Sequence, residues 1–462
     1  GAQINAIGQQ SMLKRIINFF DDKTKSSSPS VTDGATYSLT ANMISRDARK
    51  VVETLQNAGF DAYIVGGAVR DLLLGIKPKD FDVATNAEPA EVKSLFRRSR
   101  IIGRRFQIVH VQFSRELIEV TTFRSNDQAG QDTAKKNIGL RQQSKTGMLT
   151  RDNVFGSMHE DASRRDLTVN ALYYNPSDNS IHDFTSGLDD INNRTIRIIG
   201  DPSTRYREDP VRLLRVVRFA AKLGFDIDSR TAKPMSKLSA DLAQVSPPRL
   251  FDETLKLFMS GKGAAIYILL RDYNLFDYLV PQASRLANDG SNNANNLFEQ
   301  AFINTDRRIS SNQRVTPAFI YAALLWPSVE KLAAQLSEKG NSVSYALSKA
   351  SSEVISQQIH ITAIPKRFTI PMREIWDLQL QLPRRGGQRA KRLSENTRFR
   401  AGYDFILLRE QAGENLDGLG QWWTTYQEVN PEEQQQMADD AGKAVKKRRR
   451  SRGPRKKKVS ED

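Results

Sequence analysis

The stretch Tyr63–Thr85 reads YIVGGAVRDLLLGIKPKDFDVAT and has the most regular pattern of secondary structure in the chain. An apolar run with β character leads into two adjacent glycines, Gly66 and Gly67, and apolar residues at helical spacing follow. A second β-type run begins near Lys79. The pattern therefore predicts a strand, a glycine turn, a helix, a turn and a strand, in that order.

Two carboxylates come together in the second of these strands. Side chains alternate along a strand, so Asp80 and Asp82 share one face while Phe81 and Val83 point into the core. Converging carboxylates suit a two-metal phosphoryl or nucleotidyl transfer site, with Mg²⁺ as the natural ion and Mn²⁺ as a substitute. The glycine turn before them lets the backbone approach a phosphate closely.

The Asp-x-Asp pattern alone is weak, because a solvated strand face would carry the same residues. The chain repeats the pattern in Asp226–Asp228, which we expect to be a loop after a helix. The glycine turn and the order of the strands favour the metal site at Asp80 and Asp82.

Composition points to an anionic partner. The 462 residues correspond to roughly three domains at about 150 residues each. Lys and Arg number 69 against 53 for Asp and Glu, a net charge of +16. Eleven of the cations lie in Lys443–Lys458, where like charges repel, so we expect this segment to be disordered until it meets an anion. Nucleic acid and acidic membrane surfaces both fit this balance.

Residue counts also exclude several chemistries. Cysteine is absent, which removes disulfides, thiolate nucleophiles and zinc–thiolate sites. The four histidines lie at no ligand spacing, so an oxygen-ligated metal is the kind that remains. We assign no role to His110, because a strand histidine is more often a satisfied core residue than a catalyst.

The predicted fold class is α+β. A mixed α/β head is followed by an all-helical neck and body, because the chain beyond Asp201 shows almost only helical patterns. The expected boundaries are an N-terminal amphipathic segment and linker over residues 1–43, the head over 44–200, the neck over 201–262, the body over 263–430 and a disordered basic tail over 431–462.

The segment Met12–Phe20 is short, amphipathic and basic at its centre. It could touch a membrane surface or a partner helix, although a helix docked on the body or a mobile terminus is the simpler interpretation. No apolar run approaches the roughly 20 residues that a membrane span needs. We expect a cytoplasmic protein without a membrane span.

The two decisive motifs resemble a known family. Gly66–Gly75 together with Lys79–Thr85 resembles the signature of the class II nucleotidyltransferases, which comprise tRNA CCA-adding enzymes and bacterial poly(A) polymerases. The resemblance implies a nucleotidyltransferase head in which Asp80 and Asp82 hold the metal ions. It also implies that Gly66, Gly67 and Arg70 cradle the phosphates of a nucleotide.

A second motif, Glu160–Asn170, packs three acids and two arginines before a strand. On its own it could be a surface helix with i,i+3 and i,i+4 ion pairs. The family has a similar block with Phe in place of Leu167. This likeness implies that Arg164 and Arg165 neutralise phosphate charge and that Asp161 is a third catalytic carboxylate, although Asp161 could instead orient the arginines. Glu119, in a strand expected beside that of Asp80, ranks second for this role.

A third motif, Arg205–Phe219, opens a helix at Pro210 and puts Asp209, Arg212 and Arg215 on one face. Such a face could read a nucleobase, lie on RNA phosphates or simply face solvent. In the family the corresponding Glu-Asp-x-x-Arg residues read the incoming base, and here they are Glu208, Asp209 and Arg212.

The block Ile101–Val111 resembles the segment that marks bacterial poly(A) polymerases, although an ordinary hairpin could have this sequence too. We therefore predict a template-independent RNA adenylyltransferase that uses ATP. A tRNA CCA-adding enzyme is the alternative, and a catalytically inactive RNA-binding protein is a third hypothesis.

The expected partners are ATP and RNA 3′ ends, held through phosphates by Arg384–Arg392 and by the tail. The tail could also contact RNA-degradation machinery or serve only for solubility. We expect a monomer that does not bind DNA.

Overall fold

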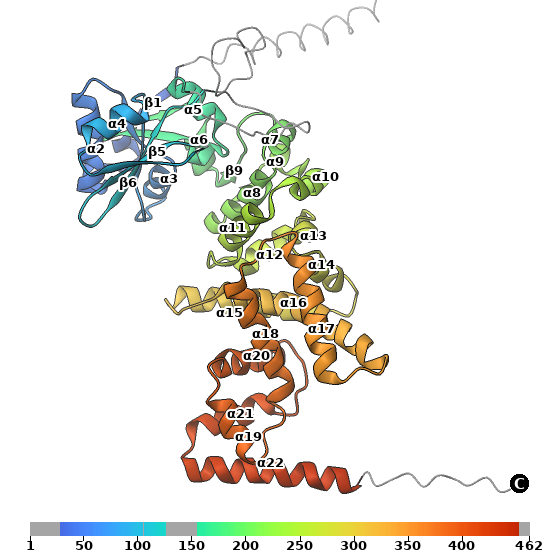
Figure 1. Ribbon diagram of the computed structural model, residues 1–462. Coiled ribbons are helices and arrows are strands. Elements are labelled where there is room, and N and C mark those ends of the chain that lie inside the picture. Colours follow the sequence, from blue (N-terminus) through green and yellow to red (C-terminus); the bar gives the residue numbers. More distant parts are fainter. Residues whose placement is uncertain (1–27, 105, 126–154, 452–462) are drawn as a thin grey trace, which may run out of the picture. The chain divides into compact units, whose positions relative to one another are not determined.

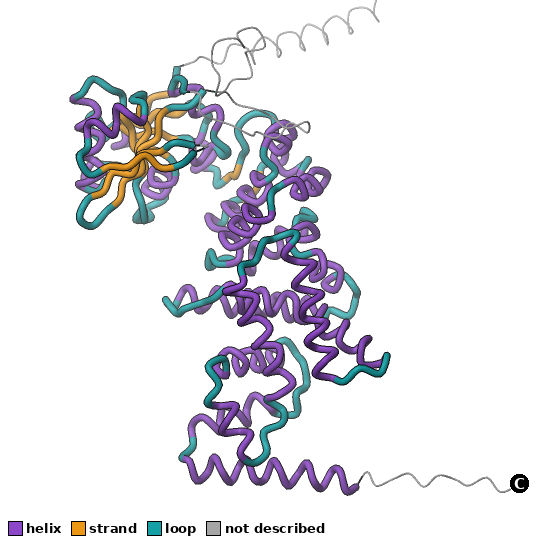
Figure 2. The backbone as a smooth tube through the Cα atoms, viewed as in Figure 1, coloured by secondary structure: helices purple, strands orange, loops and turns teal. Residues whose placement is uncertain are grey.

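The computed structural model describes residues 28–104, 106–125 and 155–451 (Figure 1). Met12–Phe20 and residues 452–462 of the tail lie outside the described residues. The chain divides into two compact units, one comprising Gly1–Arg212 and Leu223–Pro234, the other Leu213–Lys222 and Met235–Asp462. Strands belong to the first unit and the second is built from helices (Figure 2).

An eight-stranded sheet forms the centre of the first unit, in the order β1-β8-β7-β2-β3-β6-β5-β4. Neighbouring strands are antiparallel except for the parallel pair β3 and β6. The strands are β1 (Ser30–Asp33), β2 (Ala62–Val65), β3 (Asp82–Thr85), β4 (Ser99–Ile102), β5 (Ile108–Gln112), β6 (Leu117–Thr122), β7 (Leu172–Asn175) and β8 (Ser180–Asp183).

Short helices connect these strands. The helix predicted after Ile44 is α2, which begins where Ser45 caps its first turn by accepting from the amide of Ala48. Both α2 and α4 pack on the sheet. The helices of this unit are α2 (Arg46–Asn57), α3 (Gly67–Leu73), α4 (Pro89–Leu95), α5 (Met158–Arg164), α6 (Gly187–Asn192), α7 (Pro202–Glu208) and α9 (Ser229–Ala232).

Two expectations for this unit were wrong. Part of the expected linker within residues 1–43 is β1, an edge strand whose β-branched Val31 and Thr32 pair with β8. Asp226–Ile227 is not a loop but β10, which pairs in parallel with β9 (Thr195–Ile196). Asp228 then caps α9 and binds Arg197, so the second Asp-x-Asp pattern has a structural role.

The second unit is a succession of helices, as predicted from the sequence after Asp201. Helix α8 (Val211–Leu223) contributes its part from Leu213 to Lys222. The others are α10 (Met235–Leu238), α11 (Pro247–Phe258), α12 (Gly263–Asp272), α13 (Phe276–Leu279), α14 (Pro281–Ala287), α15 (Asn293–Ser310), α16 (Pro317–Glu338), α17 (Val343–Ile359), α18 (Lys366–Gln381), α19 (Gln388–Ser394), α20 (Phe399–Gln411), α21 (Leu419–Glu428) and α22 (Pro431–Ser451).

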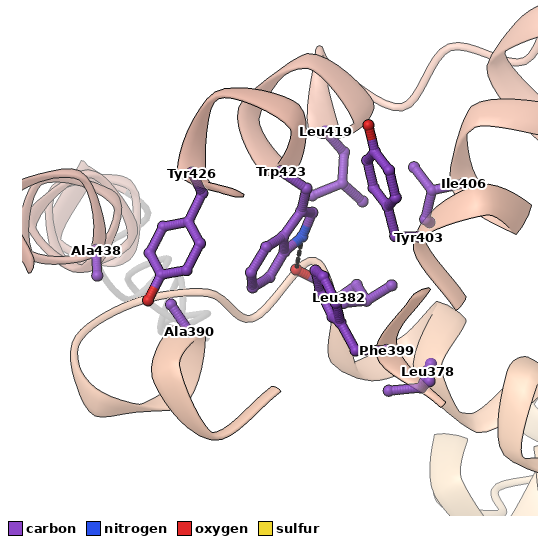
Figure 3. Close-up of a cluster of buried hydrophobic side chains, with 10 residues drawn as sticks. All are labelled: Leu378, Leu382, Ala390, Phe399, Tyr403, Ile406, Leu419, Trp423, Tyr426 and Ala438. Carbon is purple, nitrogen blue, oxygen red and sulfur yellow. Dashed lines mark hydrogen bonds between the residues drawn. The ribbon is translucent and has the colours of Figure 1, made fainter. Parts of the chain in front are cut away.

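The last helices enclose an aromatic cluster around Trp423 (Figure 3). The Trp423 ring is fully buried, and its Nε1 donates to the carbonyl oxygen of Leu382 at 3.1 Å. Phe399 packs edge-on against Trp423, with ring centres 5.1 Å apart. The cluster therefore joins α18, α20 and α21 into one packed body.

The expectation that residues 431–462 are disordered was wrong for the first 21 of them, which form α22. Ala438 is 2% exposed in the aromatic cluster, so the start of α22 is held by packing. Glu432 and Glu433 lie in the first turn, where a helix stabilises negative charge. None of the described helices is long and apolar enough to cross a membrane.

Candidate active site

The glycine turn between β2 and α3 has the backbone that its sequence predicts. Gly66 caps α3 with φ of +71°, a region where a side chain is strained. A Cβ on Gly67 would stand 3.3 Å from Nη2 of Arg70, so the second glycine makes room for that guanidinium. The positive φ accounts for glycine at position 66, and the close approach of Arg70 favours glycine at position 67.

Arg70 lies behind the turn and is 2% exposed. Its guanidinium donates to Asp71 at 2.7 and 3.0 Å and also to the side chain of Asn170. These bonds tie α3 to the segment before β7.

Asp80 and Asp82 are both exposed, whereas Phe81 and Val83 are buried. The predicted alternation of burial is therefore confirmed, but β3 begins at Asp82, so Asp80 lies just before the strand rather than in it. Although Asp82 as a residue is exposed, neighbouring protein atoms keep water from part of its carboxyl group, and this desolvation raises its pKa. The charge of Glu119 raises the pKa further, Arg165 lowers it and Asp80 raises it, so that the pKa of Asp82 is about 6. A cation at this position would relieve the repulsion.

Cross-strand pairing sets a row of polar residues beside Asp82. Glu119 of β6 is its register partner, and His110 of β5 is the partner of Glu119. Nε2 of His110 lies 3.2 Å from a carboxylate oxygen of Glu119. On the other side, Val65 separates Asp82 from Tyr173 of β7. The sequence alone does not show that His110 and Tyr173 lie near Asp82, because that depends on the strand register.

Asp161 lies in α5 and is 1% exposed. One of its oxygens accepts from the amide of Arg124 and from Arg164, both at 3.1 Å. The other accepts from Arg165 at 3.1 Å and from the hydroxyl of Tyr173 at 2.6 Å. Burial would raise the pKa of Asp161, but the two arginines and the other donors lower it to about 2.

Four donors fill the acceptor positions of this carboxylate. Asp161 therefore orients Arg164 and Arg165, one of the two interpretations left open by the sequence. A Cβ on Gly66 would lie 3.7 Å from Nη1 of Arg165, so this arginine lies beside the glycine turn.

The other acids of the second motif also have partners. Glu160 closes a capping box with Ser157 at the start of α5. Asp166 accepts from Nε of Arg212 at 2.8 Å. The cluster is thus a set of specific braces rather than a solvated surface.

The third motif is arranged around Arg212, which is 6% exposed. Its Nη1 donates to Glu208 at 2.9 Å, and Glu208 also binds Arg205 at 3.0 Å. These bonds and the one to Asp166 leave the Nη2 edge of Arg212 without a partner among the described residues. Asp209 is half-buried in the residue pair that separates α7 from α8. Glu208 braces the arginine and does not share its open edge.

Arg215 belongs to the second unit, where its guanidinium carbon lies 6.0 Å from the ring centre of Phe219. The block Ile101–Val111 forms the hairpin of β4 and β5, and Gly103 turns with φ of +95°. Its Arg105 lies outside the described residues.

The carboxylates at the start of the central strand β3 fit magnesium. No group of three or more His, Asp or Glu side chains within the described ranges is clustered tightly enough to hold a metal ion by itself. Mg²⁺ typically binds one or two carboxylates together with substrate phosphates and water, so Asp80 and Asp82 supply what the protein must contribute. The raised pKa of Asp82 reports the crowded negative charge that such an ion would neutralise.

Three family models match the chain. "Poly A polymerase head domain" matches residues 62–197, and "Probable RNA and SrmB- binding site of polymerase A" matches residues 224–286. "Polymerase A arginine-rich C-terminus" matches residues 339–457.

Curated relatives match over most of the chain. Poly(A) polymerase I of Salmonella typhi is 44% identical over 86% of this chain and 85% of its own length. Poly(A) polymerase I of Haemophilus influenzae is 44% identical over 89% of this chain and 91% of its own length. The CCA-adding enzyme of Staphylococcus epidermidis is 34% identical over 51% of this chain and 55% of its own length. The crystal structure of the Bacillus stearothermophilus CCA-adding enzyme in complex with CTP has a TM-score of 0.55 at 25% identity, over 82% of this chain and 80% of that one.

An α/β head with this glycine turn and the carboxylate strand after it, followed by helices, is the architecture of a nucleotidyltransferase. Within that class the extent of the match separates two families, because the CCA-adding relative covers about half of the chain. The chain belongs to the poly(A) polymerase family. The predicted fold class and the predicted family are both confirmed.

Proposed function

We propose that this protein adds AMP from ATP to the 3′ end of RNA without a template and releases pyrophosphate. The observation that carries the proposal is the match to poly(A) polymerases over more than four fifths of the chain. The RNA 3′-hydroxyl oxygen forms a bond to the α-phosphorus of ATP, and the bond between that phosphorus and the pyrophosphate breaks.

Asp80 and Asp82 hold the divalent ions, Mg²⁺ or Mn²⁺. When bound, these ions supply Lewis-acid activation of the hydroxyl and charge neutralisation on the triphosphate. The role of third carboxylate falls to Glu119 rather than Asp161, because Glu119 neighbours Asp82 in register while Asp161 has given all its acceptor positions to other donors.

The triphosphate lies against the turn at Gly66 and Gly67, where backbone amides can approach it. Arg165, held by Asp161 and Tyr173, stands beside Gly66 and offsets phosphate charge, and Arg164 acts with it. Arg70 belongs to the phosphate cradle as a supporting residue, because its contacts to Asp71 and Asn170 fix the turn that meets the phosphates.

Adenine is selected by Asp209 and by the open edge of Arg212, which offer an acceptor and donors on a fixed backbone. Arg215 adds positive charge one helical turn further along α8. In this proposal the head carries out catalysis, the neck recognises the nucleotide and the body binds RNA.

The RNA is held through its phosphates by Arg384–Arg392 and the basic end of the chain, so 3′ ends are used without regard to sequence. We also propose that the protein is a cytoplasmic monomer and does not bind DNA. Its basic C-terminal end contacts the RNA-degradation machinery.

Incubation of the protein with a generic RNA oligonucleotide, Mg²⁺ and each NTP separately tests the function. A long ladder with ATP alone is expected. Addition that requires CTP and a tRNA lacking its terminal CCA would establish the CCA-adding alternative, which the relative from Staphylococcus epidermidis supports over half of the chain. If no nucleotide is added but RNA is still bound, the hypothesis of a catalytically inactive RNA-binding protein would be supported.

A further inference from the structure

The loop between α18 and α19 holds a half-buried arginine that lacks a counter-ion. The guanidinium of Arg385 donates from Nη1 to the carbonyl oxygen of Pro383 at 3.3 Å, a long hydrogen bond. Its Nε is buried without a hydrogen-bond partner among the described residues, and no described carboxylate forms an ion pair with it. Burial lowers the pKa of Arg385. The Arg385 guanidinium is thus partly desolvated, and no negatively charged side chain of the described residues pairs with it.

The guanidinium rests on an aromatic platform. Its central carbon lies 5.0 Å from the ring centre of Trp422. The other rings hold Trp422 in place: Tyr426 lies parallel to it at 5.2 Å and 15°, and Trp423 meets it edge-on at 4.8 Å. Trp423 and Tyr426 belong to the buried cluster shown in Figure 3, so the platform is anchored in the core of this part of the chain.

Helix α22 fixes the backbone of the same loop. The amide of Gly387 donates to the carbonyl oxygen of Ala438 at 3.0 Å. A Cβ on Gly386 would lie 2.9 Å from the Cα of Gly442, so the two backbones touch and only glycine fits. The loop backbone next to Arg385 is therefore held against α22.

Exposed cations outnumber acids around this position. Arg384, Arg389, Lys391 and Arg392 are all exposed in the loop and α19, and Glu395 caps the end of α19. In α22, the exposed Asp439 and Asp440 lie between the two residues that contact the loop, and Asp440 pairs with Lys443 at 3.6 Å. The local charge attracts an anion, and a fixed guanidinium gives it a defined place to bind.

We propose that Arg385, held flat by Trp422, binds a phosphodiester group of unpaired RNA. Desolvating a cation is costly unless an anion pairs with it, and a phosphate oxygen provides the missing pair through charge-assisted hydrogen bonds. Arginines backed by aromatic rings are a means by which proteins track single strands without reading sequence. This inference rests on the proposed function, in which RNA is the substrate. It adds one specific phosphate contact to the basic segment Arg384–Arg392, for which only a general attraction to phosphates is proposed above.

The test compares two single substitutions in the full-length protein, Arg385→Gln and the control Arg384→Gln. Each removes one positive charge, but Arg384 is exposed and stacks on no aromatic ring of the described residues. Binding of a fluorescent unpaired 20-mer is measured by anisotropy over a salt series. We expect Arg385→Gln to weaken binding roughly tenfold and to reduce the slope of log Kd against log salt by about 0.7, one phosphate contact of a single strand. The control should lose less than a third as much.

Substitutions of the platform separate positioning from charge. Trp422→Phe keeps an aromatic face and should retain most of the affinity, whereas Trp422→Leu should resemble Arg385→Gln. Arg385→Lys keeps the charge but not the planar fork, and should also weaken binding. Equal losses for Arg384→Gln and Arg385→Gln, with equal salt slopes, would overturn the proposal, as would full affinity in Arg385→Lys.

A measurement on the unsubstituted protein avoids any effect of folding. Modification of arginines by phenylglyoxal, read by peptide mass spectrometry, should be blocked at Arg385 by the RNA 20-mer and not by ATP. Protection by ATP alone would assign the phosphate to a nucleotide, and no protection by RNA would refute the contact. The proposed function is tested separately by the ATP ladder of the same preparation: a preparation that makes the ladder but shows no special loss in Arg385→Gln refutes this inference alone.

Discussion

Asp82 lies directly opposite Glu119 in the parallel register of β3 and β6, and this pairing brings a second acid beside Asp82. The effect is visible in the pKa of Asp82, which burial and then the charge of Glu119 raise to about 6. Asp161, the rival third carboxylate, is turned toward arginines and Tyr173 instead. Substitution of Glu119 and substitution of Asp161 should therefore change different kinetic constants.

Glu119→Gln is expected to lower the turnover number roughly a hundredfold, because a carboxylate is lost beside the metal ions. Asp161→Asn should mainly raise the KM for ATP, because it loosens Arg164 and Arg165, which contact phosphate in the proposed site. Steady-state addition of AMP to an RNA oligonucleotide measures both constants. The assignment fails if Asp161→Asn lowers the turnover number more than Glu119→Gln while leaving KM unchanged.

Asp82→Asn should abolish polymerisation and yet stabilise the metal-free protein at pH 8. The pKa of Asp82 is raised in the folded state, from an ordinary value of 3.8 to about 6, so ionisation of this group costs stability as the pH rises between those values. The amide carries no charge and escapes that cost. Calorimetric midpoints at pH 8 and pH 4, without metal, measure the difference, which should shrink at the lower pH.

Magnesium provides the matched control for this prediction. Mg²⁺ should raise the unfolding midpoint of the unsubstituted protein at pH 8 and leave that of Asp82→Asn almost unchanged, since binding to the folded state alone stabilises it. The Mg²⁺ concentration needed for half-maximal activity should rise as the pH falls below about 6, because protons compete for Asp82. An equal magnesium effect on both proteins would place the ion elsewhere.

The fold was predictable from the sequence because its signals are local. The glycine turn, the alternation at Asp80–Val83 and the helical patterns after Asp201 each depend on residues close together in the chain. The errors have the opposite character: β1 exists because β8 offers it an edge, and α22 is held where Ala438 enters the aromatic cluster. A polar or highly charged stretch gives no sign of such a distant partner.

The candidate site was predictable as a set of residues but not as a set of contacts. The sequence identifies Asp161, Arg164 and Arg165 as a charged cluster, but it cannot tell a metal ligand from a brace. That distinction depends on Tyr173 and the amide of Arg124, which are brought in by the fold. Likewise, the place of His110 beside Glu119 follows from strand register alone.

Asp161→Asn should also change stability, with a characteristic dependence on pH. The pKa of this buried acid is lowered to about 2, so its ionised form contributes stability above pH 3.8 that disappears as the pH falls toward 2. The pH-dependent part is about 2 kcal/mol, from a shift of nearly two pKa units. All four tryptophans lie in the second unit, so hydrogen exchange of peptides covering residues 158–175 should be used rather than fluorescence.

Tyr173→Phe serves as the companion variant, because it removes one donor to Asp161 and keeps the ring. It should lose part of the protection from exchange seen in the unsubstituted protein at pH 7, and less than Asp161→Asn does. Protection that is the same in all three proteins at pH 7 would mean that this network does not stabilise the first unit.

Gly66→Ala should impair activity far more than it impairs folding. The turn holds Gly66 at φ +71° and ψ −133°, a sparsely populated region where a Cβ costs on the order of 1–3 kcal/mol, an amount that a unit of this size tolerates. The same Cβ would stand 3.7 Å from Nη1 of Arg165, in the space where a phosphate would meet the backbone. We expect the KM for ATP to rise at least tenfold with a normal circular dichroism spectrum. Gly75→Ala, with the same φ of +71° and no atom within 4 Å of the added Cβ, is the control and should keep its KM.

Arg212 provides the sharpest test of nucleotide choice. Its Nε and Nη1 are held by Asp166, Glu208 and the carbonyl oxygen of Arg205, so that the Nη2 edge has a fixed direction. Arg212→Lys keeps the charge but loses the planar edge, and the ratio of kcat/KM for ATP over CTP should fall at least tenfold. Asp166→Asn should reduce the same ratio more weakly, because one of the three braces remains only as a neutral acceptor. If both variants lose activity while the ratio of the two nucleotides is preserved, Arg212 supports the fold and the base is read by other groups.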